Sequence, residues 1–168
     1  MALGSRLKVS AIADLTSALD LATGSVPLSL VREIALANGT GSGQADKIFH
    51  DKRTLTASSS ENLDLAGVLT DAYGQTITFA RVKALIISAA PANVNNVVVG
   101  GHATAAWATW VADPTDKVIV RPGGVLALAA SDATAYAVTA TTADMLTVAN
   151  SGAGSSVTYD IVIIGASA

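Results

Sequence analysis

The stretch Thr76-Ile-Thr-Phe-Ala-Arg-Val-Lys-Ala-Leu-Ile-Ile-Ser-Ala-Ala90 is the strongest indicator of the fold class. It concentrates β-branched and aromatic residues, which favour a pleated and largely buried surface. Pro91 ends it, and proline is excluded from the middle of a sheet because it cannot donate to the hydrogen-bond ladder. The pattern therefore predicts a central β-strand.

Shorter apolar runs lie on both sides of this strand and are bounded by Gly, Pro, Asn and Asp, the usual turn residues. The predicted strands outside residues 76–90 include 46–56, 97–99, 118–120, 125–128, 136–139, 145–148 and 157–164. Long amphipathic helices are missing between them, and 69–75 predicts only a single helical turn or tight loop. Eight to ten short strands with this spacing indicate an all-β protein, a β-sandwich or jelly roll, rather than a parallel α/β sheet.

The N-terminal part carries a less regular pattern. Residues 1–14 have no clear period, so we expect an N-terminal arm there, followed by a single domain over 15–168. A first strand is expected near 15–22, with a turn at Gly24. Residues 26–37 alternate with period two, which predicts a strand with one buried face formed by Val26, Leu28, Leu30, Ile34 and Leu36. Arg32 falls on that same face and needs an edge position or a partner.

The composition limits the possible function classes. Apolar residues make up 51% of the 168 residues and charged residues only 14%, against about 25% in an average soluble protein. The net charge of −3 argues against a nucleic-acid partner, and no apolar run is long enough for a membrane span. There is no cysteine, so disulfides and thiolate chemistry are excluded. So little charge on a small chain predicts that part of its surface is buried in a homodimer or homotrimer.

The glycine-rich loop Asn38-Gly-Thr-Gly-Ser-Gly43 is a candidate phosphate cradle. Neither the Lys-Ser/Thr pair of a Walker loop nor the dinucleotide spacing of glycines is present. We therefore interpret Gly39, Gly41 and Gly43 as a mobile or interface loop.

Other chemistry-bearing residues also favour structural roles. His50 and Asp51 are adjacent on a predicted strand, where neighbours point to opposite faces, so they do not form a metal site. The sequence contains neither a nucleophile elbow nor a close pair of glutamates, the patterns that would indicate an enzyme. We therefore expect no catalytic residue, metal or cofactor. The aspartates that could supply calcium oxygens lie in ordinary turn contexts: Asp113, Asp116, Asp132, Asp144 and Asp160. Trp107 and Trp110 could stack on a sugar, but core or interface packing is the favoured role.

Several segments together resemble small structural proteins of tailed bacteriophages. They are Ala37–Asp46, Phe49–Thr56, Glu61–Gly67, Leu69–Phe79, Val82–Ile87 and Val118–Val125, within residues 26–165. The resemblance implies a virion component, most often a jelly-roll decoration (cement) protein on the capsid surface, made in the host cytoplasm. It would bind the major capsid protein and itself, with no membrane partner. A tail- or fibre-associated receptor module that binds a glycan is the alternative.

Overall fold

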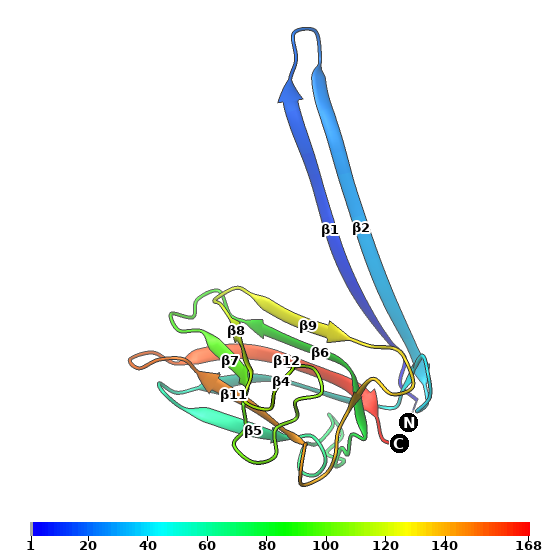
Figure 1. Ribbon diagram of the computed structural model, residues 1–168, viewed down its shortest axis with the longest axis vertical. Helices are drawn as coiled ribbons and strands as arrows, with labels where there is room; N and C mark the ends of the chain where they lie inside the picture. The colour runs from blue at the N-terminus through cyan, green and yellow to red at the C-terminus, as the bar shows by residue number, and fades with distance from the viewer. Residues whose placement is uncertain (1) are drawn as a thin grey trace.

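Two antiparallel sheets pack face to face in the computed structural model, which describes residues 2–168 (Figure 1). One sheet has the order β4 (Lys47–Leu55), β12 (Val157–Ala166), β6 (Arg81–Ala89), with β9 (Val125–Ala129) and β10 (Tyr136–Ala137) both pairing with β6. The other has the order β5 (Ser60–Asp64), β11 (Met145–Asn150), β7 (Val97–Gly100), β8 (Lys117–Val120). The all-β class and the sandwich layering are confirmed, and residues 2–168 form twelve strands, including the two of the N-terminal hairpin, in place of the expected eight to ten.

Strand β12 alternates with period two over most of its length. On β12, Tyr159, Ile161 and Ile163 point between the sheets and are at most 1% exposed. Their partners on β6 include Ile87 and Leu85, which are also fully buried. The apolar positions of both sheets thus form one main core, which is what a period of two imposes on facing strands.

The stretch 76–90, which indicated the fold class, is only partly a strand. Strand β6 begins at Arg81, and residues 76–80 lie outside any strand. Ile77 and Phe79 are nevertheless 1% exposed, and their amides donate to the carbonyls of Leu69 and Leu65. Core burial therefore explains the apolar pattern at Ile77 and Phe79, outside the strand.

A bulge interrupts the pairing of β6 with β12. Ile164 pairs with Ala84 and Gly165 with Val82, so Lys83 has no partner on β12. Lys83 is fully buried, and its Nζ donates to the carbonyl oxygen of Asp132. Burial, and then the charge of nearby Arg81, lowers the pKa of Lys83.

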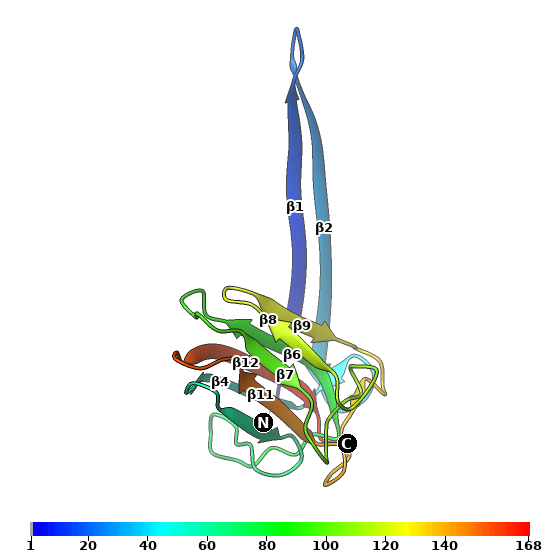
Figure 2. The ribbon, with the colours of Figure 1, turned by 60° about the vertical axis from the view of Figure 1, so that its left-hand side comes forward.

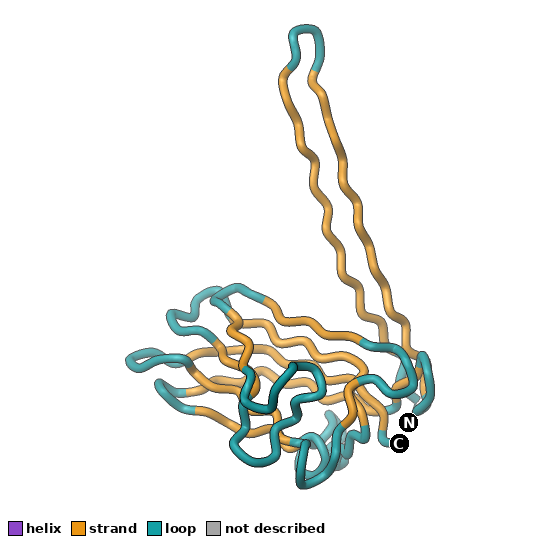
Figure 3. The backbone as a smooth tube through the Cα atoms, in the orientation of Figure 1, coloured by secondary structure: helices purple, strands orange, loops and turns teal. Residues whose placement is uncertain are grey.

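A third sheet projects from the sandwich as a long hairpin (Figures 1 and 2). Strands β1 (Ser5–Ala18) and β2 (Thr23–Asn38) pair over their whole length, and the short β3 (Gln44–Ala45) pairs with the end of β2. The tube in Figure 3 shows the two strands running side by side to a tight end loop. We call β1, β2 and their connection the hairpin arm.

The hairpin arm differs from the expected N-terminal organisation. The predicted strand over 26–37 is confirmed within β2. The predicted strand at 15–22 is wrong in part, because residues 19–22 are the turn and Gly24 lies inside β2. The boundary set at residue 14 falls inside β1. The small alanines at positions 11 and 13 weaken the alternation of β1, so only its pairing with β2 reveals it. Residues 69–75 form a tight loop, closed by the Asp71 amide donating to the Gln75 carbonyl at 2.9 Å.

Candidate functional site: the hairpin arm

The hairpin arm is amphipathic, because residues directly opposite each other in an antiparallel pair share one face. We call one side the apolar arm face; it is formed by Leu7, Val9, Ala11, Ala13, Leu15, Val26, Leu28, Leu30, Arg32, Ile34 and Leu36. Arg32 is the charged residue of this face, as the sequence pattern predicted. Its Nη1 donates to the carbonyl of Val31 at 3.0 Å.

The opposite side of the hairpin arm, which we call the polar arm face, carries charged and hydroxyl side chains. Arg6 and Glu33 form an ion pair at 3.2 Å, and the Ser25 hydroxyl donates to Asp14 at 2.7 Å. Ile12 and Val31 are the large apolar residues on this side. A solvated polar face next to an uncovered apolar one is the pattern of a sheet that buries one side against a partner.

The apolar arm face is exposed over its distal half. Leu15 is 74% exposed and Val26 68%, and Val9, Leu28 and Leu30 are 45–55% exposed. Fully burying a side chain of this size contributes about 1.5–3 kcal/mol. Because these five are 45–74% exposed, covering them would contribute about 5–9 kcal/mol before ordering costs. A two-stranded hairpin is only marginally stable by itself in water, so this surface is the best candidate for docking.

The base of the hairpin arm is anchored on the sandwich. Leu36, 5% exposed, packs in a second apolar cluster with Ala84 of β6 and Ile164 of β12. Leu7 and Ile34 of the apolar arm face join the same cluster. This contact fixes where the hairpin arm leaves the sandwich.

The glycine-rich loop lies beside this anchor. The Gly43 amide donates to the Ser131 carbonyl at 2.7 Å, and the Gly41 amide donates to Gln44 Oε1 at 2.9 Å. Gly39 has a φ of 140°, and a Cβ there would lie 2.6 Å from Gln44 Oε1. Gly39, Gly41 and Gly43 thus allow a close backbone turn that ties β2 to the sandwich. A cavity of about 820 Å³ next to this loop is lined by residues of the loop, β4 and the 71–77 segment.

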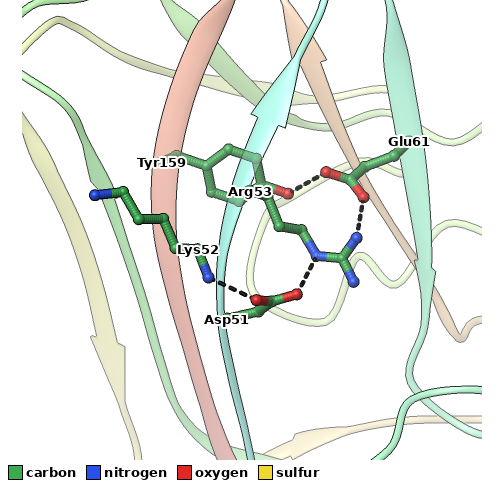
Figure 4. A network of polar contacts seen from close by, with 5 residues as sticks. All are labelled: Asp51, Lys52, Arg53, Glu61 and Tyr159. Atoms are coloured by element: carbon green, nitrogen blue, oxygen red, sulfur yellow. Dashed lines mark hydrogen bonds and ion pairs between the residues drawn. The ribbon is translucent and has the colours of Figure 1, made fainter.

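A polar network links the two sheets (Figure 4). Arg53 of β4 forms ion pairs with Asp51 at 3.3 Å and with Glu61 of β5 at 2.6 Å. The Tyr159 hydroxyl donates to Glu61 Oε1 at 2.7 Å. Burial, and then the hydrogen bond to Glu61, raises the pKa of Tyr159 far above its ordinary value. This network could not be predicted from the sequence, because Tyr159 lies 98 positions from Glu61 and no motif connects the members.

The two tryptophans lie in and beside the main core. Trp107 is 2% exposed, and its Nε1 donates to the Ala137 carbonyl at 3.0 Å. Its ring meets Tyr136 edge to face, with centroids 6.4 Å apart. Trp110 packs against the core, 6.0 Å from Trp107 between ring centroids.

The remaining candidates do not come together. His50 is exposed on β4, while Asp51 pairs with Arg53 on the other side of the strand. Asp132 caps a turn, where hydrogen bonds from the Thr134 hydroxyl and nearby amides hold its pKa at about 2. Within residues 2–168, no three His, Asp or Glu side chains converge as metal ligands, and no helix could span a membrane.

Comparisons with protein-family models, with curated proteins and with solved structures found no match to this chain.

Proposed function

We propose that this chain is a bacteriophage capsid decoration (cement) protein, located on the virion surface, that binds the assembled head and bridges neighbouring capsomers. The observation that carries the proposal is the apolar arm face, which projects from the sandwich with side chains such as Leu15 and Val26 largely exposed. A surface of this kind marks a contact with another molecule, beyond a single copy of the chain.

The sandwich supports the same proposal. Its main strands have the orders β4-β12-β6-β9 and β5-β11-β7-β8. With the two-residue β10 left aside, consecutive strands of the sandwich alternate between the two sheets except at the β7–β8 hairpin, which is the winding expected of the predicted jelly roll. Jelly rolls are common in viral capsid proteins. Because one fold can host many functions, the strand order supports the proposal, and the apolar arm face remains its main basis.

The mechanism we propose is burial of surface, with no catalytic step. A protein that binds only the assembled shell stabilises that shell by RT ln(1 + [L]/Kd) per site, about 2.7 kcal/mol at a hundredfold excess over Kd. Linking several sites through one oligomer strengthens the effect through effective concentration. The major capsid protein is the proposed partner, through contacts that are mainly apolar.

The alternative, a glycan-binding receptor module on the tail or a fibre, has less support. Stacking on a sugar needs exposed aromatic rings, and Trp107 is 2% exposed. Tyr73, at 78%, is the strongly exposed aromatic residue, and no second aromatic ring pairs with it among the described residues.

The test uses head particles of the phage that encodes the chain. Immunogold labelling should place the protein over the head surface, and particles stripped of it should lose DNA at a lower temperature than intact ones. Adding back the wild-type protein should restore the melting temperature. Labelling confined to the tail tip, or identical melting of stripped and intact particles, would overturn the proposal in favour of the receptor module.

A further inference from the structure

Arg32 determines which surface can cover the apolar arm face. It lies between Leu30 and Ile34 on β2 and opposite Val9 on β1, so any partner that covers this face also covers its guanidinium. No carboxylate pairs with Arg32 among the described residues. An arginine buried without an acidic partner is strongly destabilising, so the covering surface must bring a carboxylate that can pair with Arg32.

Packing two hairpin arms against each other does not meet this requirement. The apolar arm face contains no Asp or Glu, so face-to-face arms would bury two Arg32 side chains without an acid. In a parallel bundle about a symmetry axis, the arginines would also converge and repel one another.

The same chain does carry a surface of the required kind. We call it the outer sheet face: the side of β4, β12, β6 and β9 that points away from the main core, formed by Ile48, His50, Lys52, Ala84, Ile86, Ser88, Val125, Ala127, Ala129, Asp160, Val162 and Ile164. Asp160 is its carboxylate, exposed on β12, and neighbours Val162 along the strand. The cross-strand partners of Asp160 are Lys52 on β4 and Ser88 on β6, and the apolar pair Val162 and Ile86 comes next along this face. Lys52 lies directly across from Asp160, but no ion pair joins them in the described part of the chain.

The outer sheet face is already matched to the apolar arm face within one copy. Ile34 and Leu36 at the arm base pack against Ala84, Ile164 and Ala129 at one end of this sheet face. Beyond that contact the hairpin arm leaves the sheet (Figures 1 and 2), so the rest of both surfaces stays uncovered. The apolar chemistry of the uncovered arm therefore suits the uncovered part of another copy's sheet.

We infer that the hairpin arm of one copy docks its apolar face on the outer sheet face of a second copy, with Arg32 paired to Asp160 of that second copy. The partner of the arm is thus this chain itself, and a reciprocal exchange would give a two-fold dimer. The inference deepens the proposed function by naming the contact that links the subunits. It is tested on the purified protein without capsids, so its failure and that of the proposed function are distinguishable.

The first experiment exchanges the charges. Arg32→Asp alone places a second carboxylate against Asp160, and Asp160→Arg alone places two arginines together, so each variant should be monomeric by light scattering at concentrations where the wild type is an oligomer. Mixing the two variants pairs opposite charges at both contacts of an exchanged dimer, because the Arg32→Asp arm meets the Asp160→Arg sheet and the unchanged Arg32 meets the unchanged Asp160. Association should therefore return. Failure of the mixture to associate would overturn the inference, and so would a wild type that is monomeric at high micromolar concentration.

The second experiment uses the absence of cysteine in the chain. Arg32→Cys and Asp160→Cys proteins, carrying different tags, should form a disulfide-linked heterodimer when mixed under oxidising conditions. Each alone should give much less linked product. Equal cross-linking of Arg32→Cys with itself would instead mean that arms meet arms, against the inference.

A matched pair of arm variants separates the two arm faces. Leu30 lies on the apolar arm face and is 45% exposed, and Val31 lies on the polar arm face and is 40% exposed. The two variants are Leu30→Ser and Val31→Ser. We expect Leu30→Ser to weaken self-association by about tenfold or more, and Val31→Ser to leave it nearly unchanged. Equal effects of the two variants would contradict docking through the apolar arm face. The near-ultraviolet signal of buried Trp107 reports that both variants remain folded.

Discussion

The hydroxyl of Tyr159 on β12 donates a 2.7 Å hydrogen bond to Glu61 on β5, and so joins the two sheets across the edge of the sandwich. Glu61 also forms an ion pair with Arg53 of β4, at 2.6 Å. One carboxylate therefore satisfies a buried phenol and a half-buried guanidinium at the same time. Polar contacts of this kind, which join β4, β5 and β12, favour one register over its alternatives.

This contact predicts a loss of stability at high pH. Burial raises the pKa of Tyr159 above its ordinary value, so the folded protein holds this proton after an unfolded chain, with a tyrosine pKa of about 10, releases it. Because the folded state then binds more protons than the unfolded state, the unfolding free energy falls as pH rises. The fall should begin at about pH 10 and reach up to about 1.4 kcal/mol per pH unit. Urea unfolding between pH 8 and 11 measures the slope.

Tyr159→Phe should flatten this alkaline slope while costing about 1 kcal/mol at neutral pH for the lost hydrogen bond. Tyr73→Phe, at an exposed tyrosine, is the matched control and should leave the slope unchanged. A slope that survives in Tyr159→Phe would show that another group causes it.

Replacement of Trp107 should be the most damaging single change near the two tryptophans. Trp107 is 2% exposed and contacts both Trp110 and Tyr136. Trp107→Ala should therefore destabilise the sandwich by about 3–5 kcal/mol through the cavity it leaves. Trp110→Ala, at a partly buried side chain, should cost less. Chemical denaturation of the two variants gives both values, and a larger loss for Trp110→Ala would contradict this packing.

Removal of the distal hairpin arm should leave the sandwich folded. Lys8 and Glu33 lie directly opposite each other, so an Asn-Gly pair in place of residues 9–32 can close a two-residue hairpin there. The anchor formed by Leu7, Ile34 and Leu36 is retained, and the main core is untouched. We expect a thermal midpoint close to that of the monomeric wild type, with loss of self-association and of capsid stabilisation. Failure of this variant to fold would mean that the hairpin arm belongs to the folding unit.

Backbone hydrogen exchange should separate the arm from its anchor in the free protein. Amides of residues 9–31 should exchange faster than those of 82–88, because an exposed two-stranded hairpin opens easily. Amides of Gly41 and Gly43 should be intermediate, since both donate hydrogen bonds within the anchored loop. In the oligomer, residues 9–31 should become protected. Equally slow exchange of 9–31 and 82–88 in dilute monomer would contradict this order.

The all-β class, the central strand and the strand in residues 26–37 could be predicted from the amino-acid sequence alone. These features follow from local alternation, which any sheet burying one face must show. The position of Arg32 on the apolar face could also be predicted from the alternation alone, because a period of two assigns each residue of a strand to one face whatever the strand pairs with.

The long hairpin that projects from the sandwich became visible only in three dimensions. The small alanines of β1 leave a weak pattern, so its extent depends on pairing with β2. The bulge at Lys83, the network around Glu61 and the outer sheet face around Asp160 each join residues far apart in the chain. Their positions depend on strand register and sheet order, which are set by packing across the whole fold and not by any local run of residues.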